Sequence, residues 1–244
     1  MNTTDAKLKF LTRYSTFLTL LMLCFFLFSF NKLKEIENFE EINVKRINII
    51  ENDGTIRMVL SNKELQHSGR MDGKDWEKRE RPSGLIFFND QGDECGGLIY
   101  QTKQTKNGLI SGMSITMDRY KDDQVLQLSN QESIVNGKIM SQRGININDY
   151  PAESNITTRM ELFSQAEKIT DPEARKKKIN ELYEQHGERN LLFLGKTRGN
   201  SQGLFLNDAT GKPKLMIYVD EKGNPKIQAF NTKGEMKNVI AEDL

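Results

Sequence analysis

Acidic side chains gather in one part of the sequence. The densest group comprises Asp90, Asp93, Glu94, Asp118, Asp122 and Asp123. Two carboxylates held roughly 5–9 Å apart can hydrolyse a glycosidic bond. Most of these residues lie in turn-like segments, however, where aspartate is favoured because its side chain hydrogen-bonds the local backbone. The group therefore has two interpretations, a hydrolase centre and a set of turns, and we favour turns.

A second feature with possible chemistry is the stretch NDATGKPKLMIYVDEKGNPKIQAFNTKGEM, residues 207–236, in which Asp or Asn precedes Gly three times. A calcium loop of the EF-hand type needs glycine at its sixth position and glutamate at its twelfth. Counted from Asp220, glycine stands fourth and Asn231 twelfth. The spacing fails, so we predict turns between strands, in which glycine supplies the positive φ that short hairpin loops require.

Other catalytic signatures are missing from the sequence. Cys95 has two possible histidine partners, His67 and His186, but neither stands in a motif. With only one further cysteine, Cys24, no disulfide framework or zinc quartet can form. There is also no P-loop, HExxH or GxGxxG unit. We predict no catalytic, metal-binding or cofactor-binding residues and no cofactor.

The polar segment from about Lys63 to Pro82 is the candidate interaction loop. It contains the only tryptophan, Trp76, together with Arg79 and Arg81. Loops longer than about 15 residues in a compact domain are usually functional or disordered. A mobile insertion is the competing interpretation, and we favour it over a binding surface.

The strongest signal is the uncharged run STFLTLLMLCFFLFSF, Ser15 to Phe30, which follows Lys7, Lys9 and Arg13. Charged residues are costly in a bilayer, so a Leu/Phe run of this density belongs in lipid. Small residues typical of a signal-peptidase site are missing at its end. An uncleaved membrane anchor is favoured over a cleaved signal or lipoprotein. Its predicted transmembrane residues include Ser15, Phe17, Leu20, Leu23, Phe26 and Phe30.

The flanking charges bear on orientation and on nucleic-acid binding. The basic residues before the run favour a cytoplasmic N-terminus and a periplasmic or extracellular body. Residues 31–43, with Leu33, Ile36, Phe39 and Ile42 spaced by three, predict a helical stalk. Beyond residue 30 the chain has 32 basic and 33 acidic residues, because three basic residues and one acidic residue precede it. That balance argues against nucleic acid as a partner.

The remaining sequence predicts antiparallel hairpins. Alternating runs flank Asn52-Asp53-Gly54, and further short strands are expected at 84–89, 95–100, 109–118 and 124–129, with a weak pair around Asn136-Gly137. Residues 155–187 indicate two helices, with Asp171 capping the second and Pro172 opening it. Glycines 11 or 12 residues apart then predict a meander.

These elements divide the chain into five expected segments. They are an N-terminal tail and anchor (1–30), a stalk (31–43), a β-hairpin body (44–150), a helical hairpin (151–190) and a C-terminal meander (191–244). The meander is expected to pack with the body as one unit. The fold class is mainly β, with an inserted helical hairpin and one N-terminal transmembrane helix.

Three phrases, KRINIIENDGTIRMVLSN, GLIFFNDQGDECGGLIY and GKTRGNSQGLFLNDATGKPKLMIYVDEKGNPKIQ, resemble those of a family of bacterial membrane-anchored β-rich proteins with no assigned activity. The resemblance spans about residues 44–240. It implies that the β phrases belong to one unit, and it implies no catalytic residue.

Together these features favour a single-pass membrane-anchored envelope protein with a non-catalytic interaction or structural domain. The expected partners are the lipid bilayer, through the N-terminal helix, and an envelope protein or glycan, with a homo-oligomer also possible. The alternative is an extracytoplasmic carboxylate-dependent hydrolase acting on an envelope glycan. A further alternative, a cytoplasm-facing regulator, depends on topology.

Overall fold

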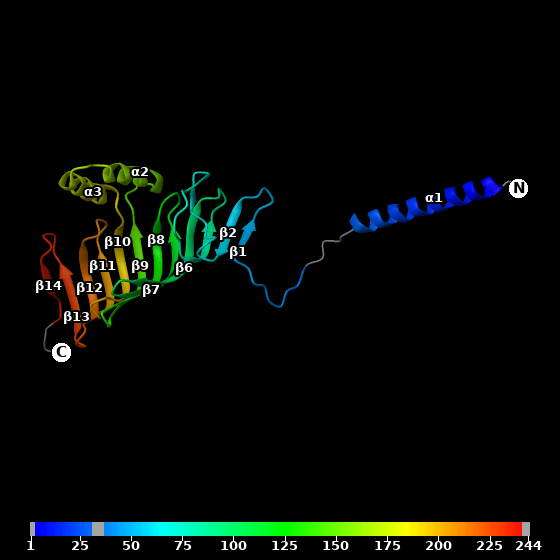
Figure 1. Ribbon diagram of the computed structural model, residues 1–244. Coiled ribbons are helices and arrows are strands. Elements are labelled where there is room, and N and C mark those ends of the chain that lie inside the picture. Colours follow the sequence, from blue (N-terminus) through cyan, green and yellow to red (C-terminus); the bar gives the residue numbers. More distant parts are fainter. Residues whose placement is uncertain (1–2, 31–36, 241–244) are drawn as a thin grey trace. The chain divides into compact units, whose positions relative to one another are not determined.

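The computed structural model describes residues 3–30 and 37–240 of the chain, in two compact units (Figure 1). The first unit, Met1–Asn43, contains the helix α1, and the second, Val44–Leu244, contains a long β sheet and two further helices. Each unit is described by itself.

Helix α1 runs from Thr3 to Phe30, and its part Thr4–Leu27 is long and apolar enough to cross a membrane. Large apolar side chains are exposed all round it, from Leu8 to Leu27. The hydroxyls of Thr12, Thr16 and Thr19 donate hydrogen bonds to carbonyls four residues earlier, so these polar groups are satisfied within the helix. Five of the six predicted transmembrane residues lie in Thr4–Leu27, and Phe30 is the last helical residue.

The predicted helical stalk is wrong over residues 37–43. These residues contain no regular secondary structure, and residues 31–36 of the same prediction lie outside the described part. The apolar residues Phe39 and Ile42 are exposed, so their spacing of three has no packing surface to stabilise a helix.

The second unit confirms the predicted mainly β, antiparallel fold. Its twelve-stranded sheet follows the order β1 (Arg46–Ile50), β2 (Ile56–Ser61), β5 (Ser83–Phe88), β6 (Glu94–Thr105), β7 (Gly108–Asp118), β8 (Gln124–Val135), β9 (Lys138–Asp149), β10 (Arg189–Lys196), β11 (Gln202–Asn207), β12 (Pro213–Val219), β13 (Pro225–Phe230) and β14 (Met236–Asn238). Each strand is antiparallel to its neighbours. Strands from both expected β segments therefore form one sheet.

Several strands are longer than predicted. Strands β6, β8 and β9 each have 12 residues, because polar stretches such as Gln101–Thr105 continue the ladder against Gly108–Gly112. Backbone pairing with the neighbouring strand holds these residues in the sheet although their side chains lack an alternating pattern. Strand β10 begins at Arg189, two residues before the expected boundary.

The three loops in Asn207–Met236 share one backbone pattern. In the loop Asp220–Asn224, the Asp220 N–H donates to the Asn224 carbonyl and the Gly223 N–H donates back to Asp220. Asp220 Oδ1 accepts from the N–H groups of Lys222 and Asn224, each at 2.9 Å. These hydrogen bonds lower the pKa of Asp220, and Gly223 has a φ of 90°. The predicted hairpins are thus confirmed, and the carboxylate closes its own turn.

The sheet has two chemically different faces. Directly paired residues project to the same side, and one face, called here the apolar face, has two rows of apolar side chains. The first row is Ile47, Leu60, Leu85, Leu98, Ile115, Leu128, Ile145, Leu194, Leu204, Ile217 and Ile227. The second is Ile49, Met58, Phe87, Met117, Leu126, Ile147, Leu192, Leu206, Leu215 and Ala229, with Gly96 between Phe87 and Met117.

The opposite face is partly covered and has a polar centre. Its matching row runs from Val59 and Ile86 through Thr116, Gln127 and Asn146 to Phe193. The buried core cluster comprises Val59, Ile86 and Phe88. His67, from the segment 63–82, lies edge-on to Phe88 with ring centres 4.8 Å apart. The segment 63–82 therefore packs on this face of the sheet through His67.

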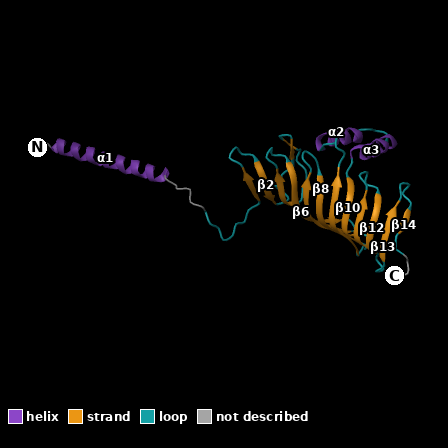
Figure 2. Cartoon of the chain, turned by 180° about the vertical axis from the view of Figure 1, so that it is seen from behind, coloured by secondary structure: helices purple, strands orange, loops and turns teal. Residues whose placement is uncertain are grey.

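The predicted helical hairpin consists of α2 (Ile156–Glu167) and α3 (Pro172–His186), side by side at one end of the strands (Figure 2). Asp171 caps α3 by accepting from the Ala174 N–H at 2.9 Å, and Pro172 follows it, as predicted. Ala166 and Leu182 are buried, and Phe163 meets Tyr183 edge-on at 4.9 Å.

Candidate functional site

A cleft of about 360 Å³ opens between the segment 63–82, the ends of β6 and β7, and helix α2. Its lining combines apolar, cationic and anionic side chains: Met71, Trp76, Arg79, Arg81, Glu94, Asp118, Asp122, Asp123, Gln124, Ile156, Arg159 and Met160. The candidate interaction residues Trp76, Arg79 and Arg81 therefore line the same cleft as four of the six grouped carboxylates. That they bind a partner stays a prediction.

Trp76 is positioned by a short hairpin inside the segment 63–82. Strands β3 (Arg70–Met71) and β4 (Lys74–Asp75) pair around Asp72-Gly73, both of which have positive φ. The Trp76 N–H then donates to the Gly69 carbonyl at 3.0 Å. The prediction of a plain loop missed this hairpin, although its Asp-Gly pair is the usual signal of a two-residue turn.

Hydrogen bonds to the backbone hold the segment 63–82 in place. Gln66 Nε2 donates to the carbonyls of Pro82 and Gly84, each at 3.2 Å, and Arg79 Nε donates to the Ser68 carbonyl at 3.0 Å. His67 is buried, which lowers its pKa, and its Nδ1 accepts from the Gly69 N–H at 3.0 Å. These contacts stabilise one conformation of the segment 63–82 against β5.

Two cations line the same side of the cleft. The Arg79 guanidinium lies over the Trp76 ring, 4.7 Å from its centroid. Arg81 makes a two-pronged contact with Glu94, at 2.7 and 2.8 Å, between side chains that are both largely buried. This geometry neutralises Glu94 and fixes its orientation.

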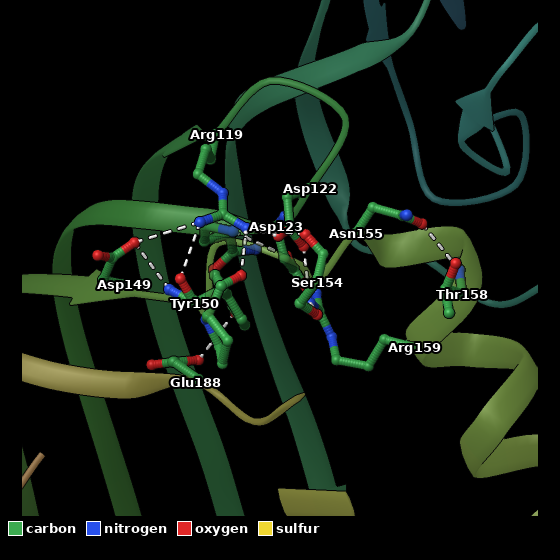
Figure 3. Close-up of polar contacts among 12 residues, drawn as sticks. Arg119, Asp122, Asp123, Asp149, Tyr150, Ser154, Asn155, Thr158, Arg159 and Glu188 are labelled. Carbon is green, nitrogen blue, oxygen red and sulfur yellow. Dashed lines mark hydrogen bonds and ion pairs between the residues drawn. The ribbon is translucent and has the colours of Figure 1, made fainter. Parts of the chain in front are cut away.

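The loop Arg119–Asp123 and helix α2 meet in a network of arginines and aspartates (Figure 3). Asp122 is 2% exposed and forms ion pairs with two arginines. Its Oδ2 contacts Arg119 Nη2, and its Oδ1 lies 2.7 Å from Arg159 Nη1. Arg119 also donates to the carbonyls of Tyr150 and Ser154, at 2.8 and 2.9 Å. One buried carboxylate thus links the sheet to the helical hairpin.

Tyr150 completes this network. The Arg159 guanidinium lies 4.2 Å from the Tyr150 ring centroid, and the Tyr150 hydroxyl donates to Glu188 Oε2 at 3.3 Å. Burial raises the pKa of Tyr150, so the hydroxyl keeps its proton. The sequence did not identify Arg159 or Tyr150, because a single sequence does not indicate that helix α2 packs on the loop 119–123.

Asp118 is the one strongly perturbed carboxylate of the cleft. Burial, followed by the negative charges of Asp123 and Glu94, raises the pKa of Asp118 to about 7. Its Oδ1 is buried and has no hydrogen-bond partner among the described residues. Near neutral pH this group can therefore donate a proton or a hydrogen bond into the cleft.

The two remaining members of the acidic group lie elsewhere. Asp90 is almost fully exposed and pairs with Arg57 Nη2 at 2.5 Å. Asp93 is buried, and its closest cation is Lys121 Nζ at 4.0 Å. Within the described residues, no group of three or more His, Cys, Asp or Glu is arranged to hold a metal ion.

Cys95 shows the properties of a structural thiol. It is half-buried, and burial together with the charge of Asp118 raises its pKa. A raised pKa leaves little of the thiolate that nucleophilic catalysis requires. The sequence-based preference for a packing role agrees with this environment.

Replacing Gly69 by alanine tests how Trp76 is held. An added Cβ would lie 2.4 Å from Trp76 Cε3, at a residue whose φ is 107°. We expect a loss of about 2–3 kcal/mol in the free energy of unfolding, from strain and displacement of the ring. Because Trp76 is the only tryptophan, its fluorescence maximum should also shift.

The matched control is Gly73→Ala, at a residue of φ 74° around which the Cβ meets nothing within 4 Å. This variant should cost about 1 kcal/mol and leave the tryptophan spectrum unchanged. Equal spectra for the two variants would show that Gly69 does not position the indole.

These features define a class of protein: a β-rich domain formed by one antiparallel meander, in a chain with an N-terminal helix apolar enough to cross a membrane. Comparison with protein-family models, curated proteins and solved structures gave no match. Functional conclusions therefore depend on the geometry of the chain itself.

Proposed function

We propose that the protein is a single-pass, membrane-anchored binding protein of the cell envelope, whose β domain recognises a ligand without transforming it. The cleft at Trp76 is the proposed binding site, and a segment of an envelope glycan is the proposed ligand class. The observation that carries the proposal is the pairing of a tryptophan platform with carboxylates that are mostly bound to arginines.

The anchor assignment is supported by composition and by surface. Helix α1 exposes apolar side chains in every direction, and Lys7, Lys9 and Arg13 precede its most apolar part. The excess of basic residues before this part supports a cytoplasmic N-terminus and an envelope-facing domain. An uncleaved anchor is consistent with the helix continuing through Phe30.

The ligand class is supported by the chemistry of the cleft. The half-buried indole, which Arg79 contacts over its ring, offers the rest of its flat apolar surface to a sugar ring. The arginines and the Asp118 carboxyl offer hydrogen bonds to hydroxyl and amide groups. Glu94 and Asp122 each form ion pairs with arginine, so their negative charges are already balanced within the protein. A cleft with this balance of charge suits a neutral polar ligand better than a highly charged one.

The alternative function, a carboxylate-dependent glycan hydrolase, is favoured by one observation. Asp118, with a pKa of about 7, has the property required of a general acid, and Asp123 lines the same cleft. A hydrolase also needs a second carboxylate free to act as base or nucleophile. The Asp123 carboxylate lies 3.7 Å from Arg159 Nη2, so it faces a cation.

Binding and hydrolysis are separated by titrating the full chain in detergent with N-acetylglucosamine oligosaccharides and measuring the heat of binding by calorimetry. We expect saturable binding that Trp76→Ala weakens at least about tenfold, as loss of a stacked ring contact predicts. Arg198→Ala, at an exposed loop outside the cleft, is the control. Asp118→Asn should retain binding within a few fold.

The outcomes are distinct. Release of shorter oligosaccharides by the natural protein, lost in Asp118→Asn, would establish the hydrolase instead. The lack of any heat of binding with every oligosaccharide would contradict the glycan ligand. For orientation, a reporter fused after Leu244 that is active only in the cytoplasm would contradict the envelope placement.

A further inference from the structure

The apolar face of the sheet has no cover within the described part of the second unit, residues 44–240. None of the twenty-one apolar side chains in its two rows is buried, whereas the opposite face includes Val59 and Ile86, which are 0% and 1% exposed. Ten members are between 36% and 56% exposed: Ile49, Leu60, Ile115, Met117, Leu126, Leu128, Ile145, Ile147, Leu194 and Ile217. An apolar sheet face normally packs against a second layer.

The size of this surface matches a stable protein interface. Adjacent strands lie about 4.8 Å apart, so a row crossing eleven strands is about 48 Å long. Two rows about 7 Å apart then form a stripe of the order of 700 Å², close to the roughly 800 Å² that each partner buries in a standard interface. Monomeric proteins rarely leave a continuous patch this large in water.

Polar groups border the stripe on the same face. The middle of the next row after Leu128 and Ile145 is polar, and its two ends are apolar. In strand order the row is Tyr100, Met113, Asn130, Arg143, Lys196, Gln202 and Val219. Arg143 forms an ion pair with Glu132 at 2.9 Å. An apolar centre with a polar rim is the usual anatomy of a protein–protein interface. This border favours a protein over hydrocarbon as the covering layer.

We propose that the apolar face binds the same face of a second copy of this chain, forming an intermolecular β sandwich. A two-fold axis in the plane between the sheets places stripe on stripe, and both uncovered faces are buried at once. Rows of branched side chains at strand spacing pack against an identical sheet with its strands within about 30° of alignment. A crossed arrangement would overlap only the middle of two such narrow stripes.

A lipid surface is a poorer occupant for structural reasons. Strands β1 and β14 each pair on one side only, which leaves a backbone edge that requires water or another polar partner. Open sheet edges do not occur in the hydrocarbon region of a bilayer. Anchoring by α1 in a shared membrane would also raise the local concentration of copies.

The experiment counts subunits of the full chain in lipid vesicles, by photobleaching of a fluorophore attached after Leu244. Leu128, the central member of the first row and 53% exposed, is changed to glutamate. We expect dimers for the natural chain and a dissociation constant raised at least about thirtyfold for Leu128→Glu. The control Gln127→Glu adds the same charge on the opposite face and should stay dimeric.

A second variant tests whether loss of the dimer is caused by misfolding. Leu194→Glu changes the same row on β10, at a residue 48% exposed. Both glutamate variants should keep the β circular dichroism of the natural chain and should be monomeric. A natural chain that is monomeric, or dimers that persist in both variants, would overturn the proposal. The proposal would also be overturned if the chain is monomeric and uses its apolar face to bind lipid.

Discussion

Replacing Asp122 by asparagine is expected to lower the free energy of unfolding by about 3–5 kcal/mol, because it leaves two arginines without their shared anion. Arg159 is 9% exposed and Arg119 is half-buried, so neither can regain full hydration in the folded chain. Asp122 Oδ1 lies 2.7 Å from Arg159 Nη1, and a neutral amide cannot balance the charge of this cation. Chemical denaturation of the full chain in detergent measures the destabilisation.

The location of the damage is also predicted. Helix α2 contacts the loop 119–123 through Arg159 and through the Ile156 N–H, which donates to the Lys121 carbonyl at 3.3 Å. Hydrogen exchange should therefore increase in α2 and α3 more than in the strands β6–β9. Uniform loss of protection over the whole sheet would contradict a role in docking the helices.

Asp149→Asn is the matched control. Asp149 also contacts Arg119, at 3.4 Å, but its side chain is 55% exposed. An exposed pair contributes little, so we expect a change below about 1 kcal/mol. If the two substitutions have equal effects, burial is not the source of the stabilisation by Asp122.

The second large effect concerns pH. The pKa of Asp118 is about 7 in the folded chain, above the ordinary value of 3.8, so the folded state retains this proton more strongly than the unfolded state does. The contribution to stability is complete below about pH 4, declines as the pH rises towards 7, and then stays low. The decline is up to about 4 kcal/mol, at 1.36 kcal/mol per pKa unit.

Asp118→Asn removes this dependence because the amide does not titrate. We expect the variant to be about 2–4 kcal/mol more stable than the natural chain at pH 8 and nearly equal to it at pH 4. Asp123→Asn removes the second cause of the shift, so the decline should move to lower pH. Parallel stability–pH curves for the natural chain and Asp118→Asn would contradict the assignment.

Local signals predicted most of the secondary structure. The alternation around Asn52-Asp53-Gly54, the glycine spacing after Gly199 and the Asp171-Pro172 cap each depend on residues close in sequence, and each element formed as expected. The polar half of β6 was missed because only pairing with β7 makes it a strand.

The cleft was predicted only in part. Trp76, Arg79 and Arg81 stood out by residue type within an unusually long polar segment. Arg159 was not recognised, because its contact with Asp122 joins residues 37 positions apart through the placement of α2 on the loop 119–123. Which carboxylates face arginines, and which one is left unpaired, depends on tertiary packing.

The strand order has a consequence for how the chain acquires its structure. Except for the short β3–β4 excursion and the helical hairpin, every strand pairs with the strand that follows it in sequence. Loop-closure entropy for such neighbours is small, and contact order is low for a β protein. Each hairpin can therefore close as soon as its second strand is free to fold. The same arrangement allows a hairpin to be gained or lost during evolution without rethreading the others.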